Sequence, residues 1–167
     1  MEYKWIIREK ANAKAVESLG KEINVNPILA NMLVNRAVDS FQKAKDFFRP
    51  DLDKLHDPFL MKDMDKAVHR LHYAIQNDEK ILVYGDYDVD GTTSVAMVYD
   101  YLRRFYDKVD FYIPDRYKEG YGISERGVRW AAENGFNLVI SLDCGIKAIE
   151  KVQLAKDLGV DFIICDH

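Results

Sequence analysis

The pattern of hydrophobic and polar positions changes character near residue 79. After that point, short apolar runs rich in β-branched residues alternate with stretches of helical periodicity. The expected strands are ILVYG (81–85), VDFYI (109–113), LVISL (138–142) and DFIIC (161–165), and the expected helices span residues 92–106, 124–134 and 146–158. This alternation predicts a doubly wound α/β domain, whose mostly parallel sheet carries helices on both faces.

Before residue 79 the readable segments are helical. The pair Asn26-Pro27 has the residue types that open helices, and it predicts a helix that continues to about Phe48. Its apolar face would contain Val34, Ala37, Val38, Phe41 and Ala44. A second helix is expected over about 61–77, with a stripe formed by Met64, Ala67, Val68, Leu71 and Ile75. The pattern therefore predicts a mainly helical extension, residues 1–78, followed by an α/β domain over residues 79–167.

Composition places the chain among soluble proteins. It is 48% hydrophobic and 31% charged, and it lacks the run of about 18 apolar residues that a membrane helix requires. The first ten residues interleave charge with apolar positions, unlike a signal peptide, so a cytoplasmic location is expected. Cys144 and Cys165 are expected to be reduced thiols, because a zinc site that joined them to His167 would lack a CxxC pair and an obvious fourth ligand.

The charge of the chain is concentrated in its second part. The net charge is −4, and residues 79–167 contain 11 basic against 16 acidic residues. This balance argues against a nucleic-acid binder that relies on a simple basic patch. It suits a site that holds cations.

Acidic residues follow three of the four expected strands. Asp86, Asp88 and Asp90 come after the first strand, Asp143 after the third, and Asp166 with His167 after the fourth. In a parallel sheet these positions share the edge where ligands bind. Two carboxylates about 4 Å apart repel by roughly 1–4 kcal/mol, so such a cluster implies raised pKa values or bound metals. Oxygen ligands with one imidazole favour Mg²⁺ or Mn²⁺, with a preference for Mn²⁺, and paired ions of this kind hydrolyse phosphoesters.

The segment DYDVDG (86–91) also matches other motifs in part. A calcium-binding EF-hand loop would need Glu at its twelfth position, where Met97 stands, and a Walker loop would need Lys after Gly91. The DVDGT segment resembles the first motif of haloacid-dehalogenase phosphatases, which would make Asp88 the nucleophile and Asp90 the general acid. That alternative assigns no clear role to the acidic residues after the third and fourth strands.

Four segments together resemble the motifs of one superfamily, the DHH phosphoesterases, and within it the RecJ-type single-strand-specific 5′→3′ exonucleases. The segments are VYGDYDVDGTTS (83–94), IPDRYKEGYGIS (113–124), SLDCGI (141–146) and CDH (165–167). The stretch 57–81 is similar to the helical lead-in of that family. Residues 79–167 would then be the N-terminal part of a DHH phosphoesterase domain.

The resemblance implies a site for two Mn²⁺ or Mg²⁺ ions. Asp88 and Asp90 would each hold one ion, and Asp143 would bridge both. His167 would bind the second ion. Asp166 would orient its neighbours. Asp86 would be a ligand or a support for one.

The resemblance also implies contacts with single-stranded DNA. Arg116 would contact a phosphate, and the segment Gly120, Tyr121 and Gly122 would let the backbone approach the strand. Tyr84 stands where smaller phosphatases of the superfamily usually have a metal-binding His, which puts that ligand in doubt. DNA repair and recombination, with a single-strand-binding protein and a helicase as partners, follow from the same resemblance.

The sequence stops at His167, inside the DHH motif, so we expect the chain alone to be inactive or nearly so. Two other members of the superfamily remain as alternatives. One is a phosphoesterase that acts on oligonucleotides or cyclic dinucleotides, against which the helical lead-in and the GYG loop argue. The other is an inactive scaffold, which would be expected to have lost Asp88, Asp90 or Asp143.

Overall fold

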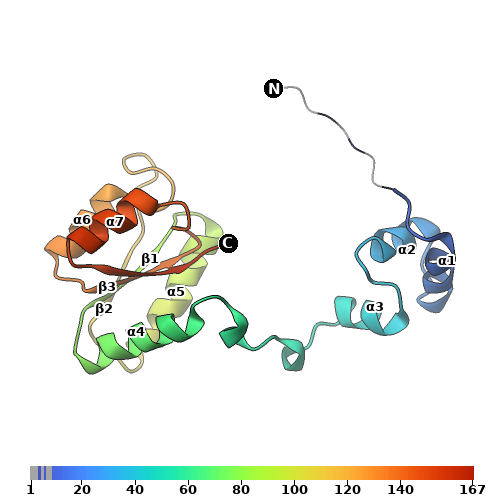
Figure 1. The fold of residues 1–167 in the computed structure, drawn as a ribbon, viewed down its shortest axis with the longest axis horizontal. Coiled ribbons are helices and arrows are strands. Elements are labelled where there is room, and N and C mark those ends of the chain that lie inside the picture. The colour runs from blue at the N-terminus through green and yellow to red at the C-terminus, as the bar shows by residue number, and fades with distance from the viewer. Residues whose placement is uncertain (1–3, 5, 7–8) are drawn as a thin grey trace. The chain divides into compact units, whose positions relative to one another are not determined.

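The computed structural model describes residues 4, 6 and 9–167. The chain forms two compact units, Met1–Asp57 and Pro58–His167 (Figure 1). The helix that was expected over 61–77 lies in the second unit, with the sheet, although the sequence pattern places it in the N-terminal extension. Among the described residues, no helix has the length and apolar character needed to cross a membrane.

The first unit contains three short helices around a small core. They are α1 (Ala13–Glu22), α2 (Pro27–Val34) and α3 (Phe41–Phe48), followed by a 3₁₀ turn, η1 (Leu52–Lys54). The side chains of Asn12, Asn26 and Ser40 cap the three helices by accepting backbone N–H bonds. The buried core residues are Leu19, Leu33, Val38 and Ala44.

The prediction of one continuous helix from Asn26 to Phe48 is wrong. Ala37 has a positive φ of 62°, and its N–H and that of Val38 bond back to the end of α2, so the chain turns there. Ser40 then caps a new helix. The predicted stripe is only partly buried, because Phe41 is 55% exposed. The apolar spacing continues through the turn at Ala37, so the periodicity alone gives no sign that the helix ends there.

The second unit confirms the α/β prediction. Its four parallel strands are arranged in the order β2-β1-β3-β4. The strands are β1 (Ile81–Gly85), β2 (Val109–Tyr112), β3 (Leu138–Leu142) and β4 (Asp161–Cys165). A 3₁₀ turn, η2 (Pro58–Leu60), precedes the helices α4 (Met64–Gln76), α5 (Val89–Arg103), α6 (Glu125–Glu133) and α7 (Ile149–Asp157).

Helices cover both faces of the sheet (Figure 1). Ile81 and Val83 of β1 pack with α4 and α5, whereas Leu82 and Tyr84 pack on the opposite side with α6 and α7. Both faces of β1 and β3 are fully buried, which explains why their sequences are apolar without alternation.

Two helices begin at other residues than the pattern predicts. Helix α5 starts at Val89 rather than near residue 92, because the side chain of Asp88 accepts the Gly91 N–H and caps the helix there. Helix α7 starts at Ile149 rather than near residue 146. Asp143 and Gly145 have positive φ values of 59° and 123°, so the chain turns after β3 before it becomes helical.

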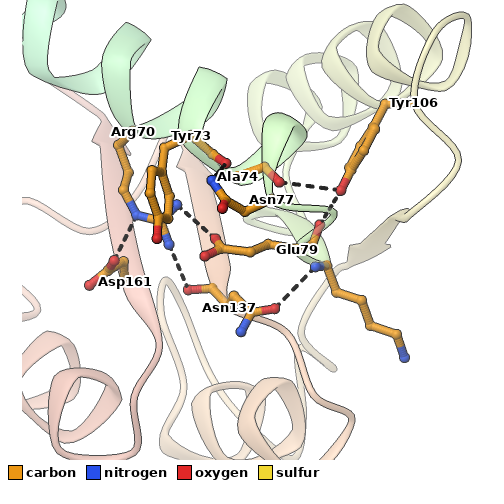
Figure 2. Close-up of polar contacts among 9 residues, drawn as sticks. Arg70, Tyr73, Ala74, Asn77, Glu79, Tyr106, Asn137 and Asp161 are labelled. Carbon is orange, nitrogen blue, oxygen red and sulfur yellow. Dashed lines mark hydrogen bonds and ion pairs between the residues drawn. The ribbon is translucent and has the colours of Figure 1, made fainter.

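A polar network joins α4 to the amino-terminal ends of the strands (Figure 2). The Arg70 guanidinium pairs with Asp161 at 2.7 Å and with Glu79 at 2.8 Å, and it also donates to the Asn137 carbonyl at 3.4 Å. The Tyr106 hydroxyl donates to the Glu79 carbonyl. Glu79, Asn137 and Asp161 lie at or just before the first residues of β1, β3 and β4, so the network stabilises the amino-terminal edge of the sheet. This edge is opposite the one that Asp86, Asp143 and Asp166 follow.

We expect Arg70→Ala to lower the free energy of unfolding by about 1–3 kcal/mol, because it leaves the Glu79 carboxylate, 18% exposed, without its cation. Urea unfolding checks this. The matched control is Arg129→Ala on α6, which removes an exposed pair with Glu125 and should change stability by less than about 1 kcal/mol. Equal effects of the two substitutions would contradict a structural role for the network.

Candidate metal centre

Three potential ligands from two neighbouring strand ends lie together at the carboxyl edge of the sheet. Donor atoms of Asp143, Asp166 and His167 are all within 4.8 Å of one another. The His167 Nδ1 is 3.9 Å from Oδ1 of Asp143 and 3.9 Å from Oδ1 of Asp166. Asp143 follows β3, and the other two follow β4, so the parallel pairing of these strands creates the group.

Backbone bonds fix this group. The Asp143 N–H donates to the Cys165 carbonyl at 2.9 Å, which continues the strand pairing one residue past β3. Asp166 accepts the Ile146 N–H on Oδ2 at 2.9 Å and the His167 N–H on Oδ1 at 2.8 Å. Asp166 therefore holds both the loop after β3 and the backbone of its own neighbour.

Asp86 is fully buried directly after β1. Its Oδ1 accepts the Tyr87 N–H at 2.6 Å, whereas Oδ2 makes no well-aligned hydrogen bond among the described residues, although the carboxylate interacts with the Tyr121 hydroxyl and raises the pKa of Tyr121. A buried carboxylate oxygen without a well-aligned hydrogen bond is costly. A cation or an ordered donor near Asp86 would remove that cost.

Asp88 and Asp90 stand at the start of α5. Asp88 accepts the Gly91 N–H on Oδ1 at 2.9 Å, which lowers its pKa, and the Tyr121 hydroxyl on Oδ2 at 3.2 Å. Asp90 is exposed in the first turn of the helix. Because a strand precedes these aspartates and the helix includes Asp90, the segment does not have the form of an EF-hand loop.

The charges after β1 affect the ionisation of Asp143, which follows β3. Burial raises the pKa of Asp143 above its ordinary value, and the negative charges of Asp88 and Asp90 raise it further. Asp166 acts in the same direction, and His167 opposes them. The group of donor atoms within 4.8 Å does not include Asp86, Asp88 or Asp90, but the charges of Asp88 and Asp90 act on Asp143, and a divalent cation bound by these carboxylates would relieve their repulsion. An oxygen-rich set with one imidazole fits Mn²⁺ or Mg²⁺.

Tyr84 does not face the carboxylates. It is buried against α6, where its hydroxyl donates to the Gly122 carbonyl at 3.1 Å and accepts the Ser124 N–H at 3.0 Å. Burial raises the pKa of Tyr84, so the phenol stays neutral. The residue at the position of the missing His ligand thus holds the end of the GYG loop, a role that the sequence analysis missed.

Arg116 lies beside Tyr87, and Tyr121 contacts both the Tyr87 ring and, through its hydroxyl, Asp88. The Arg116 guanidinium lies 5.3 Å from the centre of the Tyr87 ring, and the rings of Tyr87 and Tyr121 meet edge to face at 5.7 Å. Gly120 and Gly122 have φ values of 81° and 78°, a conformation that favours glycine. The four predicted nucleic-acid contacts therefore lie on the loop that borders Asp88.

Glu119 is a second residue that sequence reasoning missed. Its carboxylate accepts the Tyr112 hydroxyl and the Asp115 N–H at 2.9 Å, together with the Ser124 hydroxyl at 2.5 Å. Burial opposes its ionisation, but the Asp115 N–H and the two hydroxyls lower its pKa. Glu119 therefore closes the loop upon itself. The signal available in the sequence was its position directly before Gly120 in the EGYG segment.

The two cysteines do not contribute to a metal site in the described part of the chain. Both are free, and the group of metal-binding side chains at the sheet edge contains neither. Burial raises the pKa of Cys144 to about 12 and also raises that of Cys165. Both are therefore protonated thiols near neutral pH, as expected from the sequence.

Comparisons with known proteins agree on one family. The family model described as DHH family, N-terminal domain, matches residues 80–167. The single-stranded-DNA-specific exonuclease RecJ of Bacillus subtilis is 43% identical over 164 residues, which cover 98% of this chain and 21% of the relative. RecJ of Escherichia coli is 31% identical over 142 residues, covering 84% of this chain and 24% of the relative. The chain thus spans less than a third of these relatives.

Solved structures give the same result. The crystal structure of exonuclease RecJ bound to manganese is 33% identical with a TM-score of 0.59, over 64% of this chain and 28% of that one. RecJ of Thermus thermophilus in complex with Mn²⁺ has a TM-score of 0.68 over 95% of this chain and 22% of that one, and its 24% identity supports the fold alone. With its four-stranded parallel sheet and the motifs at the strand ends, the chain belongs to the DHH family.

Proposed function

We propose that the chain supplies the N-terminal part of the metal centre of a single-stranded-DNA-specific 5′→3′ exonuclease. The observation that carries this proposal is the grouping of Asp143, Asp166 and His167 after two parallel strands, β3 and β4, next to the strand β1 that Asp86, Asp88 and Asp90 follow. The relatives named above support it, since they are single-stranded-DNA-specific exonucleases and the 33%-identical RecJ structure is bound to manganese. The chain spans about a fifth of the Bacillus subtilis relative, so nuclease activity would also require the parts of such a protein that this segment does not cover.

The donor set fits two Mn²⁺ or Mg²⁺ ions. Asp88 and Asp90 would each hold one ion, Asp143 would serve both, and His167 would bind the second. When bound, such ions neutralise the phosphate oxygens and supply a nucleophile at neutral pH. Asp86, whose buried Oδ2 makes no well-aligned hydrogen bond among the described residues, would be a further ligand or a support.

The chain's own residues would position the substrate and the ligands. The Gly91 N–H fixes the Asp88 carboxylate, and Asp166 orders the backbone on which His167 stands. Arg116, held over the Tyr87 ring, would contact a DNA phosphate. Gly120 and Gly122 would let the strand approach beside Tyr121. Cytoplasmic DNA repair and recombination, with a single-strand-binding protein and a helicase as partners, complete the proposal.

A chimera tests the proposed activity. This chain would replace the matching segment of Bacillus subtilis RecJ, to which it is 43% identical. We expect Mn²⁺-dependent release of 5′-mononucleotides from single-stranded DNA, whereas the purified 167-residue chain should show little or none. A folded chimera without nuclease activity, or strong activity of the chain alone, would contradict the proposal. Dinucleotide hydrolysis without degradation of long strands would favour the small phosphoesterase alternative.

A further inference from the structure

A cavity of about 380 Å³ opens beside the metal centre, on the side of α7. Asp143, Asp166 and His167 line this cavity, and so do Lys147 and Lys151. A volume in this range suits a small organic group rather than a single ion. The cavity therefore contains, beside the candidate metal site, two lysines to which none of the roles described above applies.

The two lysines have no acidic partner among the described residues. No ion pair or hydrogen bond of either ammonium group is present in that part of the chain, although Lys151 is half-buried. The two lysines balance the charge of the two aspartates as long as the site is free of metal. Once divalent cations are bound by the aspartates, the cavity as a whole becomes positive, and it then favours an anion.

The remaining lining is apolar. The ring of Tyr121 and the side chains of Ile123 and Ile146 border the same cavity, and Ile146 is 57% exposed. Apolar and aromatic surface next to unpaired ammonium groups matches a nucleotide, which has a phosphate and a flat base. An inorganic anion would leave this surface unused.

The sheet order places the cavity relative to the predicted phosphate contact. Arg116 follows β2, on one side of β1, whereas Lys147 and Lys151 follow β3, on the other side. The carboxylates after β1 and β3 lie between them. A strand that contacts Arg116 and crosses the metal centre would therefore enter this cavity.

We infer that Lys147 and Lys151 bind the phosphate of a nucleotide next to the scissile bond, with the base of that nucleotide against Tyr121 and Ile146. The inference rests on the proposed function, because it takes the bound strand to be the nuclease substrate. It assigns a role in binding single-stranded DNA to Lys151 on α7 and to Lys147 just before that helix.

The test measures binding of a fluorescent 5′-phosphorylated oligothymidylate to the Mn²⁺-loaded 167-residue chain at several salt concentrations. The double substitution Lys147→Gln with Lys151→Gln should weaken binding roughly tenfold at low salt, as expected for two charge-assisted contacts. It should also reduce the slope of log affinity against log salt by about 1.4, since each contact on a single strand contributes about 0.7. Lys156→Gln, at the other end of the same helix, should change neither value.

Acetylation of the unaltered chain provides a readout that does not depend on a variant. Oligothymidylate should protect Lys147 and Lys151 from the reagent but not Lys156, as measured by mass spectrometry. Undetectable DNA binding, unprotected lysines, or a double variant with unchanged affinity and slope would overturn the inference. A Mn²⁺ titration separates the failure of this inference from the failure of the proposed function. If the chain binds Mn²⁺ as expected but the lysines do not affect DNA binding, only the nucleotide subsite is contradicted.

Discussion

Replacement of Asp143 by Asn is expected to weaken Mn²⁺ binding by the chain more than about a hundredfold. Substitution of residues that merely orient metal ligands typically costs roughly ten- to a hundredfold in affinity, and Asp143 is proposed to contact both ions directly. Its position between the carboxylates after β1 and the group after β4 makes it the residue that the two halves of the site share. Isothermal titration with Mn²⁺ measures the effect.

The Asp143→Asn substitution is expected to remove a metal ligand without destabilising the fold. Asn tolerates the positive φ of 59° at position 143, and the substitution removes one negative charge from a repelling cluster. The metal-free Asp143→Asn variant should therefore be at least as stable as the unaltered chain. Asp100→Asn, on the exposed side of α5, is the matched control and should bind Mn²⁺ normally. Equal Mn²⁺ affinity of the two variants would contradict the assignment of Asp143.

The second large effect is expected for Gly91→Ala. A Cβ atom at this position would lie 2.5 Å from the Asp86 carbonyl oxygen and 2.7 Å from the Asp86 nitrogen, so the backbone between β1 and α5 would have to move. We expect a loss of about 2–4 kcal/mol in unfolding free energy, which exceeds the gain of about 1 kcal/mol that Ala brings to a helix. The same shift should weaken Mn²⁺ binding, since Asp86 and Asp88 stand on this backbone.

Urea unfolding and Mn²⁺ titration of the same samples check both consequences of Gly91→Ala. Thr93→Ala serves as the control, because this residue is exposed two positions later on the same helix. It should change stability by less than about 0.5 kcal/mol. A Gly91→Ala variant as stable as the control would show that the junction between β1 and α5 can relax.

The sheet could be predicted closely because its strands are buried on both faces. LVISL and ILVYG are near-continuous apolar runs, and the observed bounds of β1 and β3 coincide with them. The ends of the helices were harder to predict from the sequence, because single side-chain contacts or backbone angles determine them. Asp88 starts α5 by capping it, and Ala37 separates α2 from α3 through one backbone angle, and neither event changes the periodicity.

The sequence predicted those parts of the candidate site that the order of parallel strands determines. Parallel strands deliver the residues that follow them to one edge, so the convergence of Asp143, Asp166 and His167 follows from their positions in the sequence. Contacts across the fold do not follow from such positions. The bonds from Tyr84 to the GYG loop and the closure of that loop by Glu119 join residues whose spacing shows no pattern.

Anomalous diffraction from crystals of the chain soaked with Mn²⁺ would test the central claim most directly. The account predicts two manganese peaks at the carboxyl edge of the sheet, with Asp143 in contact with both, Asp88 and Asp90 each in contact with one, and His167 in contact with the second. Manganese bound elsewhere, or no peak among these four side chains at saturating Mn²⁺, would contradict it.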